Sequence, residues 1–109
     1  MKVAYKVWLD RQGKAFGDGP YDLLKRVEGT ESLHQAAHQI HMSYSKAWRL
    51  IRTLEGRLGF ALLERKVGGQ SGGGSQLTPR AKDLLSRYEG FRKDVKGSLE
   101  RIYQKHFGK

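Results

Sequence analysis

The most regular alternation of apolar and polar positions lies between residues 32 and 58, where apolar residues recur at steps of three and four. This spacing predicts two amphipathic helices, the first over residues 32–40 and the second after His41 and Met42, with Ser43 as its N-cap. Their apolar faces would consist of Leu33, Ala36, Ala37 and Ile40 in the first helix, and of Ala47, Leu50, Ile51, Leu54 and Leu58 in the second. Two helices joined by so tight a turn predict a helix-turn-helix over residues 32–58.

The flanking segments predict a small β component. Residues 3–9 are β-branched and aromatic in rough alternation, and turn residues separate them from a possible return strand at 14–16, which favours an N-terminal hairpin. A helix is expected from Gly19 and Pro20 to Gly29 and Thr30. Residues 60–66 and 76–77 are expected to be the strands of a wing with its tip at 68–75. The predicted fold is mainly α with small β: a winged helix-turn-helix domain at 1–78, with the wing at 60–78.

Residues 79–109 form the second predicted unit, a long C-terminal helix. Thr78 and Pro79 are a strong helix start, and apolar residues continue at helical spacing to Phe107, over roughly 40 Å at about 1.5 Å per residue. Gly90 and Gly97 weaken this helix and allow a bend or break. The far half would expose its apolar seam, so we predict a homodimer. The expected dimer contacts are Leu84, Tyr88, Phe91, Val95, Leu99 and Ile102.

Charge points to a polyanionic partner. The net charge of +10 is uneven: residues 1–42 hold 6 basic and 5 acidic side chains, residues 43–78 hold 6 and 2, and residues 79–109 hold 9 and 4. The excess therefore begins at the second helix of the helix-turn-helix, which favours double-stranded DNA. No apolar run approaches about 18 residues and no cysteine is present, so we expect no membrane association, no disulfides and a cytoplasmic location.

The second helix and the wing carry the candidate DNA contacts. Scattered charge usually means a solvated face, but its position on a recognition helix with a wing behind it favours contact. For the recognition helix we expect Ser43, Tyr44, Ser45, Lys46 and Arg49 near base edges or phosphates. For the wing we expect Arg65, Lys66, Gln70, Ser71 and Ser75 near the DNA backbone, although a hairpin that touches nothing remains the alternative.

Other chemistry is poorly supported. His34, His38 and His41 have spacing seen in some zinc sites, but Glu31 is the one close carboxylate, so a solvated or phosphate-facing stripe is favoured over a metal. The glycine loop lacks the Gly-Lys-Ser/Thr ending of a nucleotide-binding loop. Trp48 is expected to pack partly in the core. No nucleophile and base can be paired, which predicts a protein that is not an enzyme and needs no cofactor.

Three segments resemble one family of regulators. They are Met42-Ser-Tyr-Ser-Lys-Ala-Trp48, Leu54-Glu-Gly-Arg-Leu-Gly59 and the glycine-rich stretch that runs from Gly68 to Leu77-Thr78. Together they are similar to the N-terminal DNA-binding domain of the molybdate-dependent ModE regulators. LysR-type regulators share the pattern of Glu55, Leu58-Gly59, Arg65 and Leu77-Thr78, but typically lack this wing and the N-terminal hairpin.

The ModE resemblance implies a dimer that binds an inverted repeat and commonly represses genes of molybdate uptake. It also implies that molybdate is bound by domains that follow this one, so we expect no oxyanion effector on this chain alone. His41 stands in the turn where the family often has glycine. Arg49 and Arg52 make the recognition helix more basic than the family pattern.

Two other functions remain open from the sequence. A nonspecific architectural DNA-binding protein would rely on the charge of residues 79–109 as much as on the recognition helix, and it would show no preferred site. A dimerisation module that docks a partner protein would keep its partner after Lys46 and Arg49 are replaced. We favour the sequence-specific transcriptional regulator.

Overall fold

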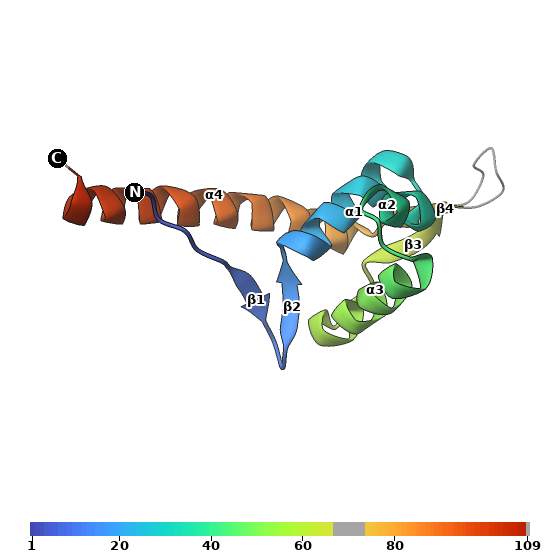
Figure 1. Cartoon of the computed structure of the whole chain (residues 1–109). Coiled ribbons are helices and arrows are strands. Elements are labelled where there is room, and N and C mark those ends of the chain that lie inside the picture. Colours follow the sequence, from blue (N-terminus) through green and yellow to red (C-terminus); the bar gives the residue numbers. More distant parts are fainter. Residues whose placement is uncertain (67–73, 109) are drawn as a thin grey trace.

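A computed structural model describes residues 1–66 and 74–108, in an elongated molecule of 59 × 27 × 24 Å. Helix α4 (Pro79–Phe107) runs along its length, and the other helices gather around the beginning of α4 (Figure 1). In chain order the other elements are β1 (Trp8–Asp10), β2 (Lys14–Gly17), α1 (Asp18–Thr30), α2 (Leu33–Gln39), α3 (Tyr44–Leu58), β3 (Leu63–Lys66) and β4 (Gly74–Leu77). The predicted winged helix-turn-helix with an N-terminal hairpin and a long last helix is confirmed.

The core lies where α1, α2 and α3 meet the first half of α4. Helical spacing of apolar residues supplies it, as expected: Leu33, Ala36, Ala37, Ala47, Ile51 and Leu54 are buried from the helix-turn-helix, and Leu23, Leu24 and Val27 from α1. Phe16 of β2, Leu62, Leu77, and Ala81, Leu85 and Tyr88 of α4 complete it. The two alanines of α2 leave room for α3 to approach closely.

Three helix starts have side-chain caps, of which Ser43 and Thr78 are predicted by the sequence and Ser32 is not. The hydroxyl oxygens of Ser32, Ser43 and Thr78 accept hydrogen bonds from backbone N–H groups three residues further on, at 3.0, 3.1 and 3.1 Å. The turn between α2 and α3 places His41 in the left-handed region at φ 58°. Glycine is the usual residue for such a backbone, so the turn is formed here by a residue that is strained in it.

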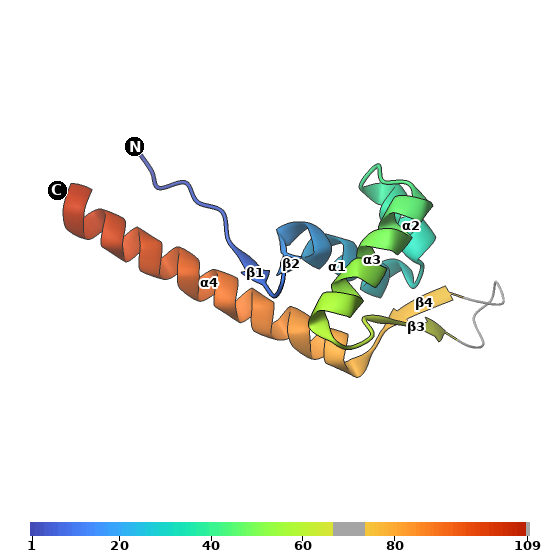
Figure 2. The same ribbon diagram turned by 90° about the horizontal axis from the view of Figure 1, so that it is seen from below.

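The N-terminal hairpin is smaller than predicted. Its first strand covers Trp8–Asp10 and pairs antiparallel with β2, which has four residues, so Val3 to Val7 have no strand to pair with. Residues 1–7 instead run as an extended arm towards the C-terminal end of α4 (Figures 1 and 2). The Tyr103 hydroxyl donates to the Met1 carbonyl at 2.9 Å, which attaches the arm to the helix.

Helix α4 is long and continuous, as predicted. It runs through Gly90 and Gly97 without the break that these residues allow, because each glycine costs only about 1 kcal/mol and helix-forming residues flank it. One of the expected dimer contacts is placed differently. Tyr88 does not lie on an exposed seam: it is 2% exposed, and its ring packs edge-on against Phe16 with centroids 5.1 Å apart. Tyr88 therefore belongs to the domain's own core, and Leu84 packs partly against the same core.

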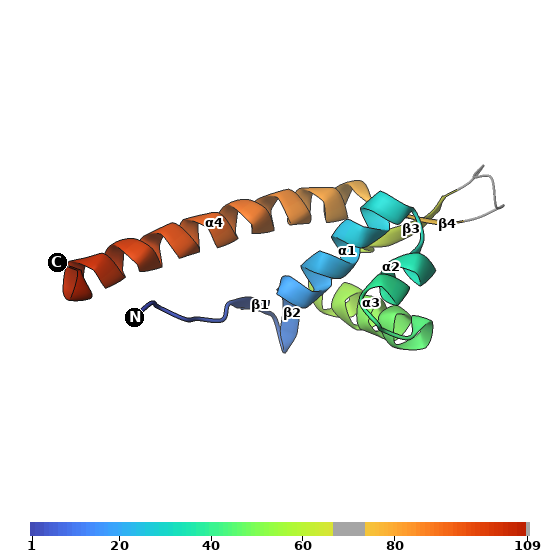
Figure 3. The same ribbon diagram turned by 45° about the horizontal axis from the view of Figure 1, so that its top comes forward.

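The distal half of α4 is the least covered part of the helix. Phe91, Ile102 and Phe107 are exposed, and Val95 and Leu99 are half-buried. Figure 3 shows this half extending away from α1, α2 and α3. No helix in the described part of the chain is long and apolar enough to cross a membrane.

Candidate nucleic-acid interface

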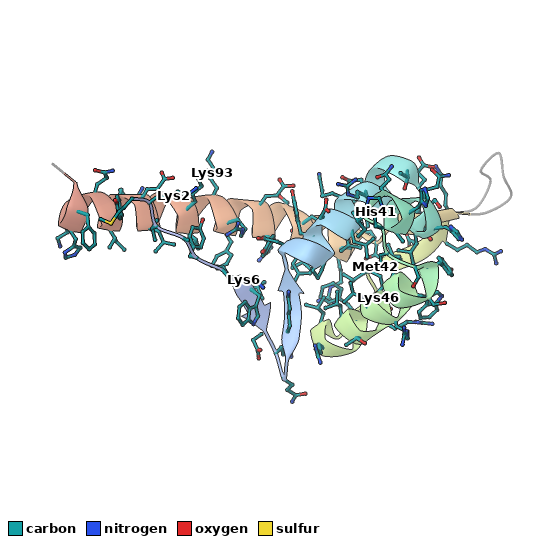
Figure 4. All side chains as sticks on the ribbon, viewed as in Figure 1. Lys2, Lys6, His41, Met42, Lys46 and Lys93 are labelled. Carbon is teal, nitrogen blue, oxygen red and sulfur yellow. The ribbon has the colours of Figure 1, made fainter. Side chains whose placement is uncertain are left out.

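Helix α3 presents a polar and cationic face opposite its buried one. Ala47, Ile51 and Leu54 point into the core, while Ser45, Lys46 and Arg49 are exposed. Ser43 caps the helix through the Lys46 N–H, so the first turn begins at a fixed place. His41 and Met42 form the turn that leads to Lys46 (Figure 4). Hydroxyl and ammonium groups on the first turns of an exposed helix are suited to base edges and phosphates.

Tyr44 is held at the start of α3 by a residue of the preceding helix. Its ring stacks on His34 of α2, with centroids 5.0 Å apart and an interplanar angle of 20°. Both side chains are exposed. The stack therefore orders an aromatic hydroxyl at the tip of the recognition helix. The sequence did not reveal this pair, because no spacing rule joins residues on different helices.

Trp48 is more exposed than predicted. It is 38% exposed, because Ala47 and Ile51 already occupy the inward face and residue 48 points about 100° away from residue 47. The Arg52 guanidinium lies over the indole ring, 4.1 Å from its centroid. This pair adds a cation to the face of α3, about one helical turn beyond Arg49.

A groove of about 660 Å³ separates α3 from the wing. Tyr44, Trp48 and Arg52 line it from α3, and Arg65 and Ser75 line it from the two wing strands. Figure 2 shows the wing strands beside α3. The structure thus brings two of the predicted wing residues and one of the predicted recognition-helix residues to the same surface.

The base of the wing is fixed by Glu55 and Thr78. The Glu55 carboxylate accepts from the Leu62 N–H at 2.7 Å and, more weakly, from the Leu63 N–H at 3.5 Å. Thr78 donates its hydroxyl to the Ala61 carbonyl at 2.7 Å and its N–H to the Leu62 carbonyl at 3.0 Å. Both strands of the wing are therefore tied to the segment that leaves α3.

The outer part of the wing rests on the corner between α1 and α2. The Ser75 N–H donates to the Glu31 carbonyl at 2.9 Å, and Lys66 forms an ion pair with the Glu31 carboxylate. A side chain at Gly74 would place its Cβ 2.5 Å from that same carbonyl oxygen. Only glycine therefore allows β4 to approach this closely.

The predicted wing contacts thus have different surroundings. Arg65 is exposed and lines the groove, whereas Lys66 is half-buried beside Glu31 and has part of its charge balanced there. Gln70 and Ser71, with the expected wing tip, lie outside the described residues.

Several cations are exposed on this surface. Lys46, Arg49, Arg52 and Arg65 are exposed cations, and Arg52 has Glu55 as a weak partner at 3.6 Å. Among residues 1–66 and 74–108, no three histidine, aspartate or glutamate side chains come together as a metal site requires. What this arrangement can do is neutralise phosphates and donate hydrogen bonds.

The fold and this surface define a winged helix-turn-helix domain. Two solved structures share the fold over 79% of this chain: a CbnR DNA-binding domain in complex with DNA, with a TM-score of 0.58 and 23% identity over 93% of that chain, and Vibrio fischeri DarR in complex with DNA, with a TM-score of 0.56 and 20% identity over 28% of that chain.

The family can be stated more closely. Residues 21–82 match the family model of the bacterial regulatory helix-turn-helix proteins of the lysR family. The chain belongs to this family.

Curated relatives narrow the similarity further. The chain is 30% identical to the molybdenum transport protein ModE of Azotobacter vinelandii over 85% of its own length and 34% of that protein. It is 39% identical to the transcriptional regulator ModE of Haemophilus influenzae over 62% of its own length and 26% of that protein. The chain therefore spans about a third or less of these relatives, and it is ModE-like in its helix-turn-helix domain.

Proposed function

We propose that this chain is a sequence-specific DNA-binding transcriptional regulator and not an enzyme. The observation that carries the proposal is the polar face of α3, on which Ser45, Lys46 and Arg49 are exposed. Tyr44, Trp48 and Arg52 of the same helix line a groove formed with the wing. Lys46 and Arg49 supply charge to phosphates or bases, and Ser43, Tyr44 and Ser45 supply hydroxyl groups at the first turn. Arg65 and Ser75 line the groove from the wing strands, where they would lie near the sugar–phosphate backbone of bound DNA.

The functional unit is a homodimer that reads an inverted repeat in the cytoplasm. Phe91, Ile102 and Phe107 expose apolar surface on the distal half of α4, and Val95 and Leu99 are partly exposed between them. A second copy of the same helix is the simplest cover for such a seam. Two-fold symmetry of the protein then requires two-fold symmetry of the DNA site.

The regulated genes are those of molybdate or related transport or metabolism, and the regulator represses them. This part of the proposal depends on two facts about the relatives: they are named ModE, and their sequences are 30% and 39% identical to this chain over the aligned residues. The oxyanion effector is not bound by this chain alone.

Selection of genomic DNA by the purified protein at near-physiological salt tests the proposal. Retained fragments are sequenced, and the same selection is run with a Lys46→Ala/Arg49→Ala variant. An inverted repeat enriched upstream of a few genes by the parent, and lost with the variant, is expected. If the retained sites lie upstream of genes unrelated to molybdate, the assignment of regulated genes is overturned, but sequence-specific DNA binding is not.

A second candidate is a nonspecific architectural protein, favoured by the 9 basic and 4 acidic residues of segment 79–109. Retention of all fragments alike, with steep salt dependence, would support it. Full binding of a partner protein by the double variant, without DNA enrichment by the parent, would instead identify a docking module.

A further inference from the structure

The first half of α4 is joined to α1 by two tyrosine–carboxylate hydrogen bonds. The Tyr88 hydroxyl of α4 donates to Asp18 Oδ1 of α1 at 2.6 Å. In the opposite direction, the Tyr21 hydroxyl of α1 donates to the Glu89 carboxylate of α4. Each helix therefore contributes one phenol and one carboxylate, and we call Asp18, Tyr21, Tyr88 and Glu89 the tyrosine clamp.

Cations and ring packing support the tyrosine clamp. Arg92 Nε lies 3.0 Å from Asp18 Oδ1, and Lys25 Nζ lies 3.6 Å from Glu89 Oε1. The rings of Tyr21 and Tyr88 pack with centroids 5.6 Å apart. Hydrogen bonds to ionised carboxylates are shorter and stronger than neutral ones. Two such bonds join α1 to α4 beside the packed rings.

The protonation states of Tyr21, Tyr88 and Glu89 favour these hydrogen bonds. Burial, and then the hydrogen bond to Asp18, raise the pKa of Tyr88, and burial and Glu89 do the same for the pKa of Tyr21. The hydrogen bond from Tyr21 lowers the pKa of Glu89. Both phenols remain donors and Glu89 remains ionised under ordinary conditions.

The tyrosine clamp sits where α4 leaves the domain. Tyr88 is the last buried residue of α4 within the described chain, and the exposed Gly90 follows directly. Residues 89–107 extend about 28 Å at about 1.5 Å per residue, so a tilt of about 10° would move the far end by about 5 Å. A displacement of this size exceeds the spacing of about 3.4 Å between successive base pairs.

We propose that the tyrosine clamp fixes the angle between the recognition helix and the dimerisation helix, and thereby determines which half-site spacing the dimer accepts. The inference rests on the proposed function, in which the protein binds DNA as a homodimer. Tyr21, Tyr88, Asp18 and Glu89 are positioning residues in it: they act through α4 and need not touch DNA.

The absence of cysteine from the sequence permits a direct measurement. A spin label on Thr53→Cys, an exposed position of α3, reports one distance between the two recognition helices of a dimer by pulsed electron paramagnetic resonance. In the Tyr21→Phe/Tyr88→Phe background, which keeps both rings, we expect the distance distribution to broaden while the circular dichroism of the domain is retained.

DNA binding gives the second readout. On synthetic inverted repeats built from the selected sequence, moving the half-sites apart by one base pair should weaken the parent by about tenfold, as one mismatched pair does. The clamp variant should lose most of this discrimination and bind a single half-site as the parent does.

Two further variants make the result decisive. Asp83→Asn removes the exposed ion pair with Arg87 on the same helix, at 2.9 Å, and should leave both readouts unchanged. Asp18→Ala/Glu89→Ala removes the acceptors from exposed positions and should reproduce the effect if the double phenylalanine variant does not fold.

The two proposals fail in different ways. A dimer with an unchanged distance distribution and unchanged spacing preference in the clamp variants overturns the clamp alone. A parent that gives no distance between protomers overturns the dimer, and the clamp with it.

Discussion

The two halves of α4 have similar apolar spacing but very different surroundings. The first half contributes Ala81, Leu85 and Tyr88 to the core of the winged helix-turn-helix domain. In the second half, Ile102 and Phe107 are 54% and 66% exposed. A periodic pattern therefore shows that a helix has an apolar face, but it does not show what covers that face. The first half completes a core, and the second half is available to a partner.

The largest effect that would test this contrast is expected at Leu85. Leu85→Ala removes a side chain that is almost fully buried, and it should lower the free energy of unfolding by about 2 to 5 kcal/mol. Urea denaturation at a concentration where the protein is monomeric measures it. Ile102→Ala is the matched control and should change the value by less than about 0.5 kcal/mol. Equal losses would place both halves in one core and remove the contrast.

Replacing lysines in the two regions compares their roles on DNA. Lys46→Ala should weaken binding to the selected sequence by about 1 to 3 kcal/mol if the side chain reads a base, and should relax the preference at one position. Lys93→Ala removes the same charge from the exposed distal part of α4 (Figure 4) and should leave the preference unchanged. Fluorescence anisotropy on specific and scrambled duplexes measures both. If Lys93→Ala costs as much as Lys46→Ala, the charge of α4 contributes as the architectural alternative requires.

Thr78 stands at the junction of the wing and α4, so its removal should affect the first half of the helix. Thr78→Ala deletes the cap on the Ala81 N–H and the bond to the Ala61 carbonyl, with an expected loss of about 0.5 to 2 kcal/mol in unfolding free energy. Thr53→Ala removes an exposed threonine from α3 and should be nearly neutral. Thermal denaturation in which the two variants behave alike would show that Thr78 is not a cap in solution.

The smallest change in stability is expected from backbone strain in the helix-turn-helix, at positions where no apolar contact is removed. His41 has φ 58° and Gly59 has φ 84°. His41→Gly should stabilise the domain by up to about 1 kcal/mol, and Gly59→Ala should destabilise it by a similar amount. Chemical denaturation of both variants gives the sign of the change in unfolding free energy. A loss of stability in His41→Gly would mean that contacts of the imidazole outweigh the strain.

The sequence predicted those features that depend on local chemistry. Helical spacing identified the buried faces of α2 and α3, and cap preferences identified Ser43 and Thr78 correctly. Features that need two distant segments were missed. The sequence gives no spacing between Tyr88 and Asp18, which lie 70 positions apart, so it predicts Tyr88 as a dimer contact although this residue is buried in the core.

The candidate site shows the same division. Ser45, Lys46 and Arg49 are exposed as predicted, because one face of α3 is apolar and the other is charged. Trp48 was expected partly in the core, but its neighbours fill the inward face and it pairs with Arg52 instead. The partnership of Lys66 with Glu31 could not be predicted, since it depends on how the wing rests on the corner between α1 and α2.

The close approach of Gly74 to the Glu31 carbonyl has a consequence for the evolution and engineering of this domain. A Cβ added at Gly74 would lie 2.5 Å from the carbonyl oxygen of Glu31, which is a backbone atom. Backbone cannot move aside as the end of a long side chain can. In a selection from randomised wing sequences, position 74 should return to glycine, and grafted wings should be accepted when they keep that anchor residue.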